Sequence, residues 1–503
     1  MKTMTLRRSL LLGAGLAAML ASGPALSAEH GGKLIYGIGE DIQHFDPALL
    51  PAVNFPIIPQ LFDSVVRLDE KTEPQPGLAE SWEFSDDGLS LTLHLRDDVV
   101  FHDGTPLTAE DIAWNIARYQ DPETGANARV LMMAITSAEA ADDHTLVLGF
   151  DAPQAAIFDG LDLLYVIKPT EDLDGVRANP VGTGPFKLER RAPGDSISFV
   201  RNDDYWNGDM PYLDAVEMRV LPDSFSGTVA IETGEINLLG TPPEDELGRL
   251  ADIDGLEVLQ AGSPSVVRDV IFNVESDGPF GNKLVRQAVH YAIDRDRVID
   301  VVRAGQSEPW CLPWHNGSIA FTPADRDCPR DVEKAKALLA EAGYPDGFET
   351  SIVTGANEES ILVAQILAAN LADIGIVAQI DQVEVPQERW RAGTFEISVH
   401  GYGRANRDPA TLLTTTSVFR PSNNFARYAS EEYSTLVNGI ATTIDDPEGR
   451  KAMLADLDAL MLDEMWVVSV APNFMAYAHE DEVEGLRVNL DGMPFLEGVW
   501  LDQ

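Results

Sequence analysis

The fold is decided by residues 350–380, whose sequence is TSIVTGANEESILVAQILAANLADIGIVAQI. Two short apolar runs, at residues 350–353 and 376–380, predict two β-strands. Residues 358–374 between them predict a helix, and Gly375 is typical of a helix end. A strand–helix–strand unit of this length favours two parallel strands joined by a right-handed crossover. The chain is therefore expected to be an α/β protein.

Similar patterns extend in both directions from this unit. Further strands are expected at residues 33–37, 90–96, 144–150 and 395–401, and further helices at residues 283–292 and 331–342. Residues 90–96 alternate between apolar and polar side chains, which is typical of a half-buried strand. Thr108 and Asp111 have the spacing of a capping box at the start of a helix. These patterns predict a strand-rich lobe followed by a helix-rich lobe that begins near Phe272.

The first 28 residues predict an export signal. Lys2, Arg7 and Arg8 precede an apolar run at residues 10–20, and small residues follow as far as Ala28. This order is typical of a secretory signal peptide, here cleaved near Ala28. The adjacent arginines leave both Sec and twin-arginine export open. We therefore expect a periplasmic protein from which residues 1–28 are removed.

The composition excludes several classes of function. The chain has 82 acidic and 36 basic residues and a formal net charge of -46, which argues against nucleic-acid partners and anionic membrane surfaces. The nine histidines are scattered, and no hydrolase or metalloprotease motif occurs. We expect no catalytic residues, no metal site and no cofactor. Cys311 and Cys328 are expected to form a disulfide in an oxidising compartment.

Four groups of segments together resemble the ABC-transporter extracellular solute-binding proteins of family 5, the peptide/nickel type. They are residues 101–112 (FHDGTPLTAEDI), residues 182–186 with 199–206, residues 284–295 and residues 335–344. The resemblance implies a bilobal periplasmic-binding-protein (Venus flytrap) fold of the large three-subdomain type. It also implies a monomeric receptor that encloses a small solute and delivers it to the membrane permease of an ABC importer.

The same resemblance implies a division of the chain into two lobes. Lobe one would contain residues 29–271 and 487–503, with an inserted subdomain at about residues 75–190. Lobe two would contain residues 272–486. Hinge crossings are expected near residues 272–277 and 481–487, so that ligand binding closes the two lobes.

The main ligand-binding candidates follow the strand expected at residues 395–401, because α/β lobes bind ligands beyond the carboxyl ends of strands. They are Tyr402, Arg404, Asn406 and Arg407. In related receptors this loop often carries an acidic residue that pairs with a peptide amine, but Ala405 stands at that position here. Arginine pairs with carboxylates. The ligand is therefore either a peptide-like solute or a non-peptide organic anion, such as an opine-like, sugar-derived or amino-acid-derived acid. The two arginines could instead pair with the protein's own carboxylates.

The resemblance also indicates further candidates outside this loop. They are His44, Phe45, Asn54 and Phe55 in lobe one, Trp390, Asn424 and Phe425 in lobe two, and Trp314 beside Cys311. Aromatic side chains in a cleft can bury a ligand and stack on it, although each alone is also a common packing residue. An exported hydrolase or chaperone-like module is the remaining alternative, and binding without turnover would exclude it.

Overall fold

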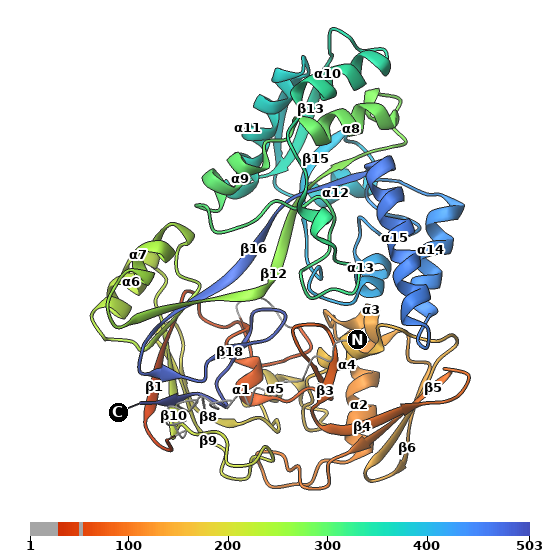
Figure 1. The fold of residues 1–503 in the computed structure, drawn as a ribbon. Helices are drawn as coiled ribbons and strands as arrows, with labels where there is room; N and C mark the ends of the chain where they lie inside the picture. Colours follow the sequence, from red (N-terminus) through yellow and green to blue (C-terminus); the bar gives the residue numbers. More distant parts are fainter. Residues whose placement is uncertain (1–28, 50–53, 503) are drawn as a thin grey trace, which may run out of the picture.

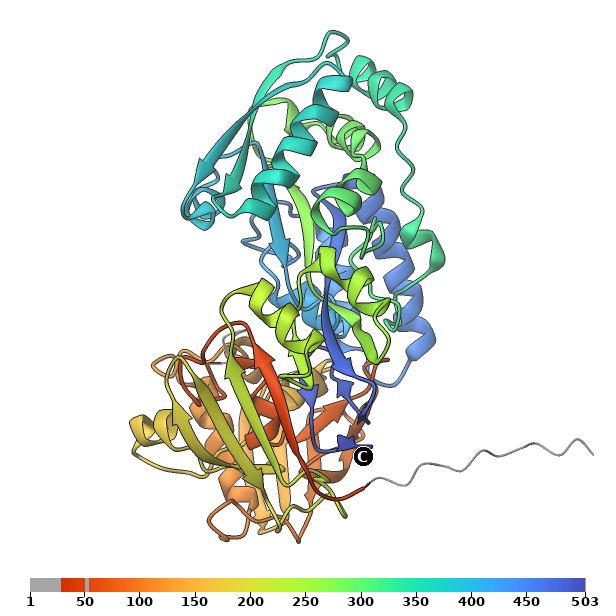
Figure 2. The same ribbon diagram turned by 90° about the vertical axis from the view of Figure 1, so that its left-hand side faces the viewer.

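The computed structural model describes residues 29–49 and 54–502, so the expected export signal lies outside the described residues. Two lobes are stacked on each other and connected by two long antiparallel strands, β12 (Leu256–Phe272) and β16 (Val467–Glu480) (Figures 1 and 2). This bilobal α/β architecture confirms the predicted fold class. Among the described helices, none is long and apolar enough to cross a membrane.

One ten-stranded sheet runs through both lobes. In order, its strands are β14 (Val377–Val383), β13 (Glu349–Gly355), β15 (Ile397–Tyr402), β12, β16, β11 (Leu238–Gly240), β1 (Lys33–Ile38), β10 (Ala215–Val220), β9 (Ser196–Arg201) and β8 (Phe186–Ala192). In lobe one, β1 pairs in parallel with β10 and β11. In lobe two, β13 pairs in parallel with β14 and β15. Each parallel set ends at one edge of its lobe, where loops can gather around a ligand.

The pairing of β12 with β16 is irregular where the chain passes between the lobes. Its register shifts between Gln260 and Pro264 and again between Pro264 and Val266, opposite residues 473–476 of β16. Irregularities of this kind bend a strand and increase its twist locally. The two connecting strands therefore change direction within their length.

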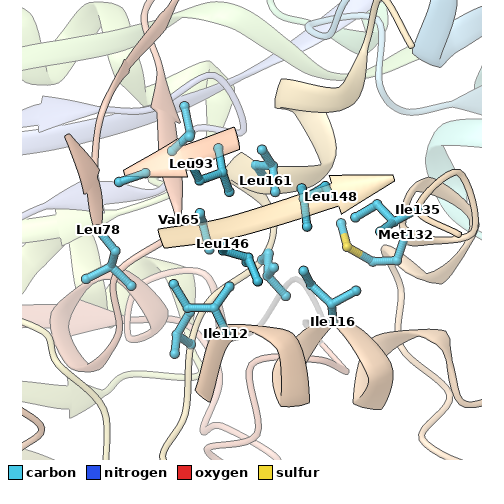
Figure 3. Packing of buried hydrophobic residues seen from close by; sticks show 14 of the residues in the cluster. Val65, Leu78, Leu93, Ile112, Ile116, Met132, Ile135, Leu146, Leu148 and Leu161 are labelled. Atoms are coloured by element: carbon cyan, nitrogen blue, oxygen red, sulfur yellow. The ribbon is translucent and has the colours of Figure 1, made fainter. Parts of the chain in front are cut away.

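A second, four-stranded antiparallel sheet lies in lobe one. It contains β4 (Ala79–Phe84), β5 (Ser90–Leu95), β7 (Thr145–Gly149) and β6 (Ser137–Asp142), and it packs against α2 (Ala109–Gln120). The predicted alternation of β5 is confirmed, because its three leucines are buried and share a core with Ile112 and Ile116 of α2 (Figure 3). The predicted capping box is confirmed as well: the Thr108 amide donates to Asp111 Oδ2 at 2.8 Å.

Lobe two contains the strand–helix–strand unit expected from the sequence. Helix α11 (Glu358–Asp373) connects β13 to β14, and these strands are parallel as predicted. Its other helices are α8 (Lys283–Ala292), α9 (Arg295–Val302), α10 (Val332–Glu341), α12 (Pro386–Ala392), α13 (Pro409–Thr415), α14 (Glu431–Thr442) and α15 (Pro447–Glu464). Lobe one adds α1 (Ile58–Leu61), α3 (Arg129–Met132), α4 (Ile157–Asp162), α5 (Leu173–Ala178), α6 (Ser224–Glu232) and α7 (Leu247–Ala251), with the short strands β2 (Val66–Leu68), β3 (Pro74–Pro76), β17 (Val483–Glu484), β18 (Arg487–Val488), β19 (Pro494–Phe495) and β20 (Trp500–Leu501).

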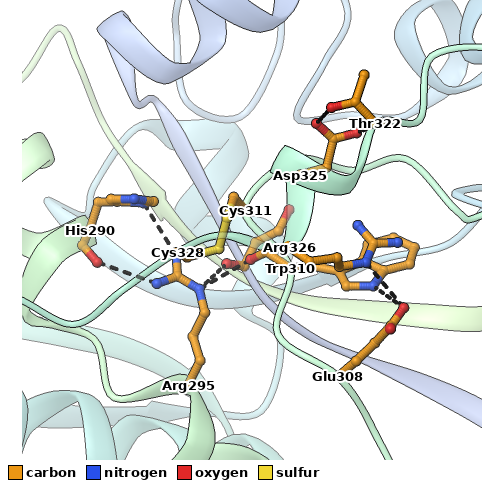
Figure 4. The surroundings of a disulfide bond; sticks show 10 residues. His290, Arg295, Glu308, Trp310, Cys311, Thr322, Asp325, Arg326 and Cys328 are labelled. Carbon is orange, nitrogen blue, oxygen red and sulfur yellow. Dashed lines mark hydrogen bonds and ion pairs between the residues drawn. A yellow bond between two sulfur atoms is a disulfide. The ribbon is translucent and has the colours of Figure 1, made fainter.

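A disulfide closes the long connection between α9 and α10. Cys311 and Cys328 are joined, with their Cα atoms 5.7 Å apart (Figure 4). Beside them, the guanidinium of Arg326 lies 4.1 Å from the ring centroid of Trp310, and both side chains donate to Glu308 (Figure 4). The disulfide and these contacts stabilise a loop that has no regular secondary structure over most of its length.

Candidate functional site

Residues 402–408, which connect β15 to α13, lie where lobe two meets lobe one. The Asn406 side-chain amide donates to the Leu490 carbonyl at 2.6 Å and to Asp491 Oδ1 at 2.9 Å. The backbone N–H of Asp408 donates to Asp159 Oδ2 at 3.0 Å. The loop selected from the sequence therefore occupies the contact between the lobes, and it touches α4 and the C-terminal segment.

Arg407 is a buried cation within this contact. Its side chain is paired with Asp162 at 2.5 Å and with Asp491, and the residue is only 2% exposed. Burial alone would lower the pKa of Arg407, but Asp491 and Asp162 raise it above its ordinary value. These two carboxylates explain Arg407 without any ligand. Of the two roles considered from the sequence, pairing with the protein's own carboxylates fits these contacts.

Arg404 differs from Arg407 although it lies only three residues earlier. Its Nη2 donates to the Asn127 carbonyl of lobe one at 3.1 Å, and its side chain is half-buried. Burial, followed by the charge of Arg407, lowers the pKa of Arg404. The backbone of Arg404 has φ of 68°, a left-handed conformation that is uncommon for residues other than glycine. Arg404 thus donates to a neutral partner, and it forms no ion pair among the described residues.

Tyr402 and Trp314, both predicted ligand contacts, are buried in the core of lobe two. Tyr402 is 3% exposed, and its hydroxyl lies 2.9 Å from Ser469 Oγ. Trp314 is 1% exposed, and its indole N–H donates to Asp458 Oδ1 at 2.6 Å. Burial raises the pKa of Asp458 to about 7, and this indole N–H partly opposes that shift. Both rings lie in one apolar cluster of lobe two, so packing accounts for them.

The four lobe-one candidates lie around residues 50–53, which are outside the described part of the chain. Asn54 holds the loop by donating to the His44 carbonyl at 2.5 Å and accepting from the Gln43 amide at 3.3 Å. Phe45 is 1% exposed, and Phe55 packs against the same core. His44 is half-buried, and desolvation lowers its pKa. The described contacts of His44 and Asn54 therefore position a loop.

Trp390, Phe425 and Asn424 are brought together beside one cavity of lobe two. The rings of Trp390 and Phe425 are 5.4 Å apart. The side-chain amide of Asn424 fixes the loop after α13 by donating to the Arg420 carbonyl at 2.8 Å and to the Tyr428 carbonyl. All three residues line a cavity of about 510 Å³. These three predicted ligand contacts therefore border one cavity that is large enough for a group of a ligand.

Three further residues that the sequence reasoning missed line the same cavity: Arg391, Arg420 and Arg427. We call this cavity, together with its three arginines, the arginine pocket. A signal for it does exist in the sequence. Residues 389–427 contain six arginines but only two acidic residues, whereas the whole chain has an acidic excess. A local reversal of charge balance of this kind marks a region where anions are attracted.

Lobe one contains a separate cavity at the carboxyl ends of its parallel strands. It measures about 430 Å³ and is lined by residues that follow or end β1, β11 and β10, including Glu40, Thr241 and Pro222, and by Tyr36 and Tyr477. Ligands of α/β proteins commonly bind at such strand ends. Within the described residues, no group of three or more His, Cys, Asp or Glu side chains is placed to hold a metal ion.

Comparison with known proteins agrees with this two-lobed architecture. Residues 73–424 match the sequence profile described as bacterial extracellular solute-binding proteins, family 5 Middle. The chain belongs to this family. Heme-binding protein A of Haemophilus influenzae is 29% identical over 418 residues, which cover 75% of this chain and 76% of that protein. The glutathione-binding protein GsiB of Pectobacterium atrosepticum is 27% identical over 511 residues and covers 98% of both chains.

Solved structures show the same fold. HbpA2 from Haemophilus parasuis superposes with a TM-score of 0.85 at 24% identity, covering 94% of this chain and 100% of that one. The periplasmic binding protein DppA from Helicobacter pylori, in complex with the peptide STSA, has a TM-score of 0.76 at 27% identity and covers 94% and 99%. The family 5 solute-binding protein described here thus shares its overall architecture with both of these proteins.

Proposed function

We propose that this solute-binding protein captures a peptide or peptide-like solute between its lobes in the periplasm and delivers it to the membrane subunits of an ABC importer. One observation carries the proposal. The glutathione-binding relative matches over 98% of both chains, so the similarity includes both lobes and the strands between them. The related DppA structure holds a peptide.

Closure would follow from bending of the two connecting strands. Register shifts between Gln260 and Val266, opposite residues 473–476, are the irregular positions at which β12 and β16 can change direction. On this proposal the lobes divide within these strands, at residues 260–266 and 473–476, which lie before the boundaries that the sequence suggested at residues 271 and 486. A ligand that contacts both lobes would favour the closed arrangement by its differential affinity for it.

The function is tested by measuring the thermal stability of the mature protein with a panel of di- and tripeptides, including glutathione. A ligand at one hundred times its dissociation constant should add about 2.7 kcal/mol to the free energy of unfolding. The bound compound should be recovered chemically unchanged, since the protein is proposed to bind without catalysis. Stability that does not respond to any peptide, or recovery of a cleaved peptide, would contradict the proposal.

A non-peptide organic anion is the second candidate ligand. Ala405 occupies the position where related receptors often have an acidic residue, so an amine partner is missing from that position. The arginine pocket supplies cations nearby in the sequence. Small organic acids in the same stability assay separate this candidate from the first.

A further inference from the structure

The arginine pocket is unusual because it concentrates positive charge in a strongly acidic protein. Arg391 comes from α12, while Arg420 and Arg427 come from the loop between α13 and α14 (Figure 1). The other lining residues are aromatic, amide or hydroxyl side chains, and no carboxylate is among them. Four other cavities in the described residues are each lined by at least one acidic side chain. The arginine pocket therefore differs from these four cavities in having basic side chains and no acidic one.

The hydrogen bonds of these arginines leave donors unused. Within the described part of the chain, none of the three forms an ion pair. Arg420 Nη2 donates weakly to the Asn423 carbonyl at 3.3 Å, and its Nε is buried without an acceptor. Arg427 Nη2 donates to the Arg391 carbonyl at 2.9 Å, whereas the Arg391 side chain is exposed to solvent. Each guanidinium can therefore still donate to an incoming anion.

The surrounding structure holds these groups in place. Asn424 fixes the loop, and the indole N–H of Trp390 is bound to Ser398 Oγ at 2.9 Å, which fixes the ring. Arg427 lies over Gly393, where a Cβ atom would collide with the guanidinium. The backbone of Arg427 has φ of 59°, which costs about 1 kcal/mol for a side chain of this kind. Strained backbone conformations of this kind are often found at binding sites. The conformation of Arg427 therefore favours a binding role for the loop.

We propose that the arginine pocket is an anion-binding subsite that selects solutes carrying a carboxylate or a similar oxyanion. This inference rests on the proposed solute-binding function and specifies the class of solute. Guanidinium groups form bidentate hydrogen bonds with such anions. The net charge of -46 repels anions at long range, so their binding requires a local group of cations of this kind. Trp390 and Phe425 provide apolar surface for the adjoining part of the solute.

The experiment compares the C-terminally amidated tripeptides Ala-Glu-Ala and Ala-Gln-Ala by isothermal titration calorimetry, because only the first of these amidated peptides carries a carboxylate. The wild-type protein should bind the glutamate peptide at least about tenfold more tightly. Arg391→Gln and Arg420→Gln should each reduce this preference to about threefold or less, and Arg391→Lys should retain part of it. Arg389→Gln is the matched control, because Arg389 is on the same helix but pairs with Asp381 and does not line the pocket.

The outcomes separate this inference from the function on which it rests. Equal binding of both peptides by the wild-type protein would overturn the anion subsite and leave the peptide-binding function in place. If neither peptide binds, inorganic phosphate and citrate serve as probes. An Arg391-dependent rise in melting temperature with citrate alone would support the subsite for an organic acid, and the same rise with phosphate would assign it to a free inorganic anion. No rise with either would overturn it.

Discussion

The arginines of lobe two have two kinds of surroundings. The first is that of Arg407 in the contact between the lobes, and the second is that of the arginines that line the arginine pocket. Arg407 is buried between the lobes, and Asp162 and Asp491 neutralise it. Arg391 and Arg420 border an open pocket, and none of its lining residues is acidic. A buried cation with two carboxylates contributes to the native structure, because removing either side leaves an unpaired buried charge. A partly exposed cation without a carboxylate can receive an anion from solution. The partners of an arginine therefore decide its role more than its position in the chain.

The largest expected effect comes from breaking the buried contact. Arg407→Met should lower the free energy of unfolding by about 3 to 5 kcal/mol, because buried Asp162 and partly buried Asp491 would both lose their cation. Arg391→Met is the control and should change stability by less than about 0.5 kcal/mol, because Arg391 is exposed. Urea unfolding of both variants measures the difference. Equal midpoints for the two variants would show that the contrast between the groups is wrong.

The sequence predicts the local structure far better than it predicts the roles of the arginines in lobe two. Strand β5, the capping box of α2 and the β13–α11–β14 unit are encoded by residues close together in the chain, so periodicity and spacing were sufficient. The partners of Arg407 are 245 and 84 residues away in sequence. Nothing near Arg404 and Arg407 distinguishes the two, and only the packing of α4 and the C-terminal segment against this loop does so.

The arginine pocket also depends on contacts between distant segments, which the sequence alone does not predict. Trp390, Asn424 and Phe425 were selected from a family resemblance, and the structure places them around one cavity. Arg391 and Arg427 were missed because they lie on separate segments that meet only in the folded lobe. Their shared signal, an excess of arginine at residues 389–427, is compositional and gives no geometry.

The second prediction uses pH to examine the buried contact. Asp159 is 2% exposed and accepts hydrogen bonds from the Asp408 amide and the Thr411 hydroxyl. Burial raises the pKa of Asp159 to about 7; Arg407 opposes this shift and Asp408 adds to it. The folded protein therefore holds a proton on this group that the unfolded chain, with a pKa of about 3.9, releases earlier. Its contribution to stability is complete below about pH 4 and is lost as pH rises to about 7.

Asp159→Asn should remove this dependence. Between pH 5 and pH 8 the wild-type protein should lose on the order of 2 kcal/mol more stability than the variant, because asparagine keeps an acceptor oxygen without a charge. Urea unfolding at the two pH values measures the difference. The charged groups that act on Asp159 include Arg407, Asp408, Asp162 and Arg404, and all of them are present in both proteins. Parallel pH curves would contradict the assignment.

A smaller effect should distinguish the two groups by their response to salt. Raising the NaCl concentration from about 0.02 M to about 0.5 M should weaken binding of an acidic tripeptide about threefold, because the pocket is partly open to solvent. The stability difference between the wild-type protein and Arg407→Met should hardly change, because that contact is buried. Calorimetry at the two salt concentrations and parallel urea unfolding test both statements. If the stability difference caused by Arg407→Met also changed strongly with salt, the buried contact would not differ from the arginine pocket in its exposure to solvent.

Arg404 is intermediate between the two groups, and its replacement should have a small effect on stability. It is half-buried, and its described hydrogen bond is to a neutral carbonyl of lobe one, that of Asn127. Arg404→Ala should therefore lower the free energy of unfolding by only about 1 kcal/mol. Arg404→Gly should lower it less, because φ of 68° is accessible to glycine without strain. If Arg404→Ala instead also weakened binding of an acidic solute tenfold or more, Arg404 would belong with the pocket arginines.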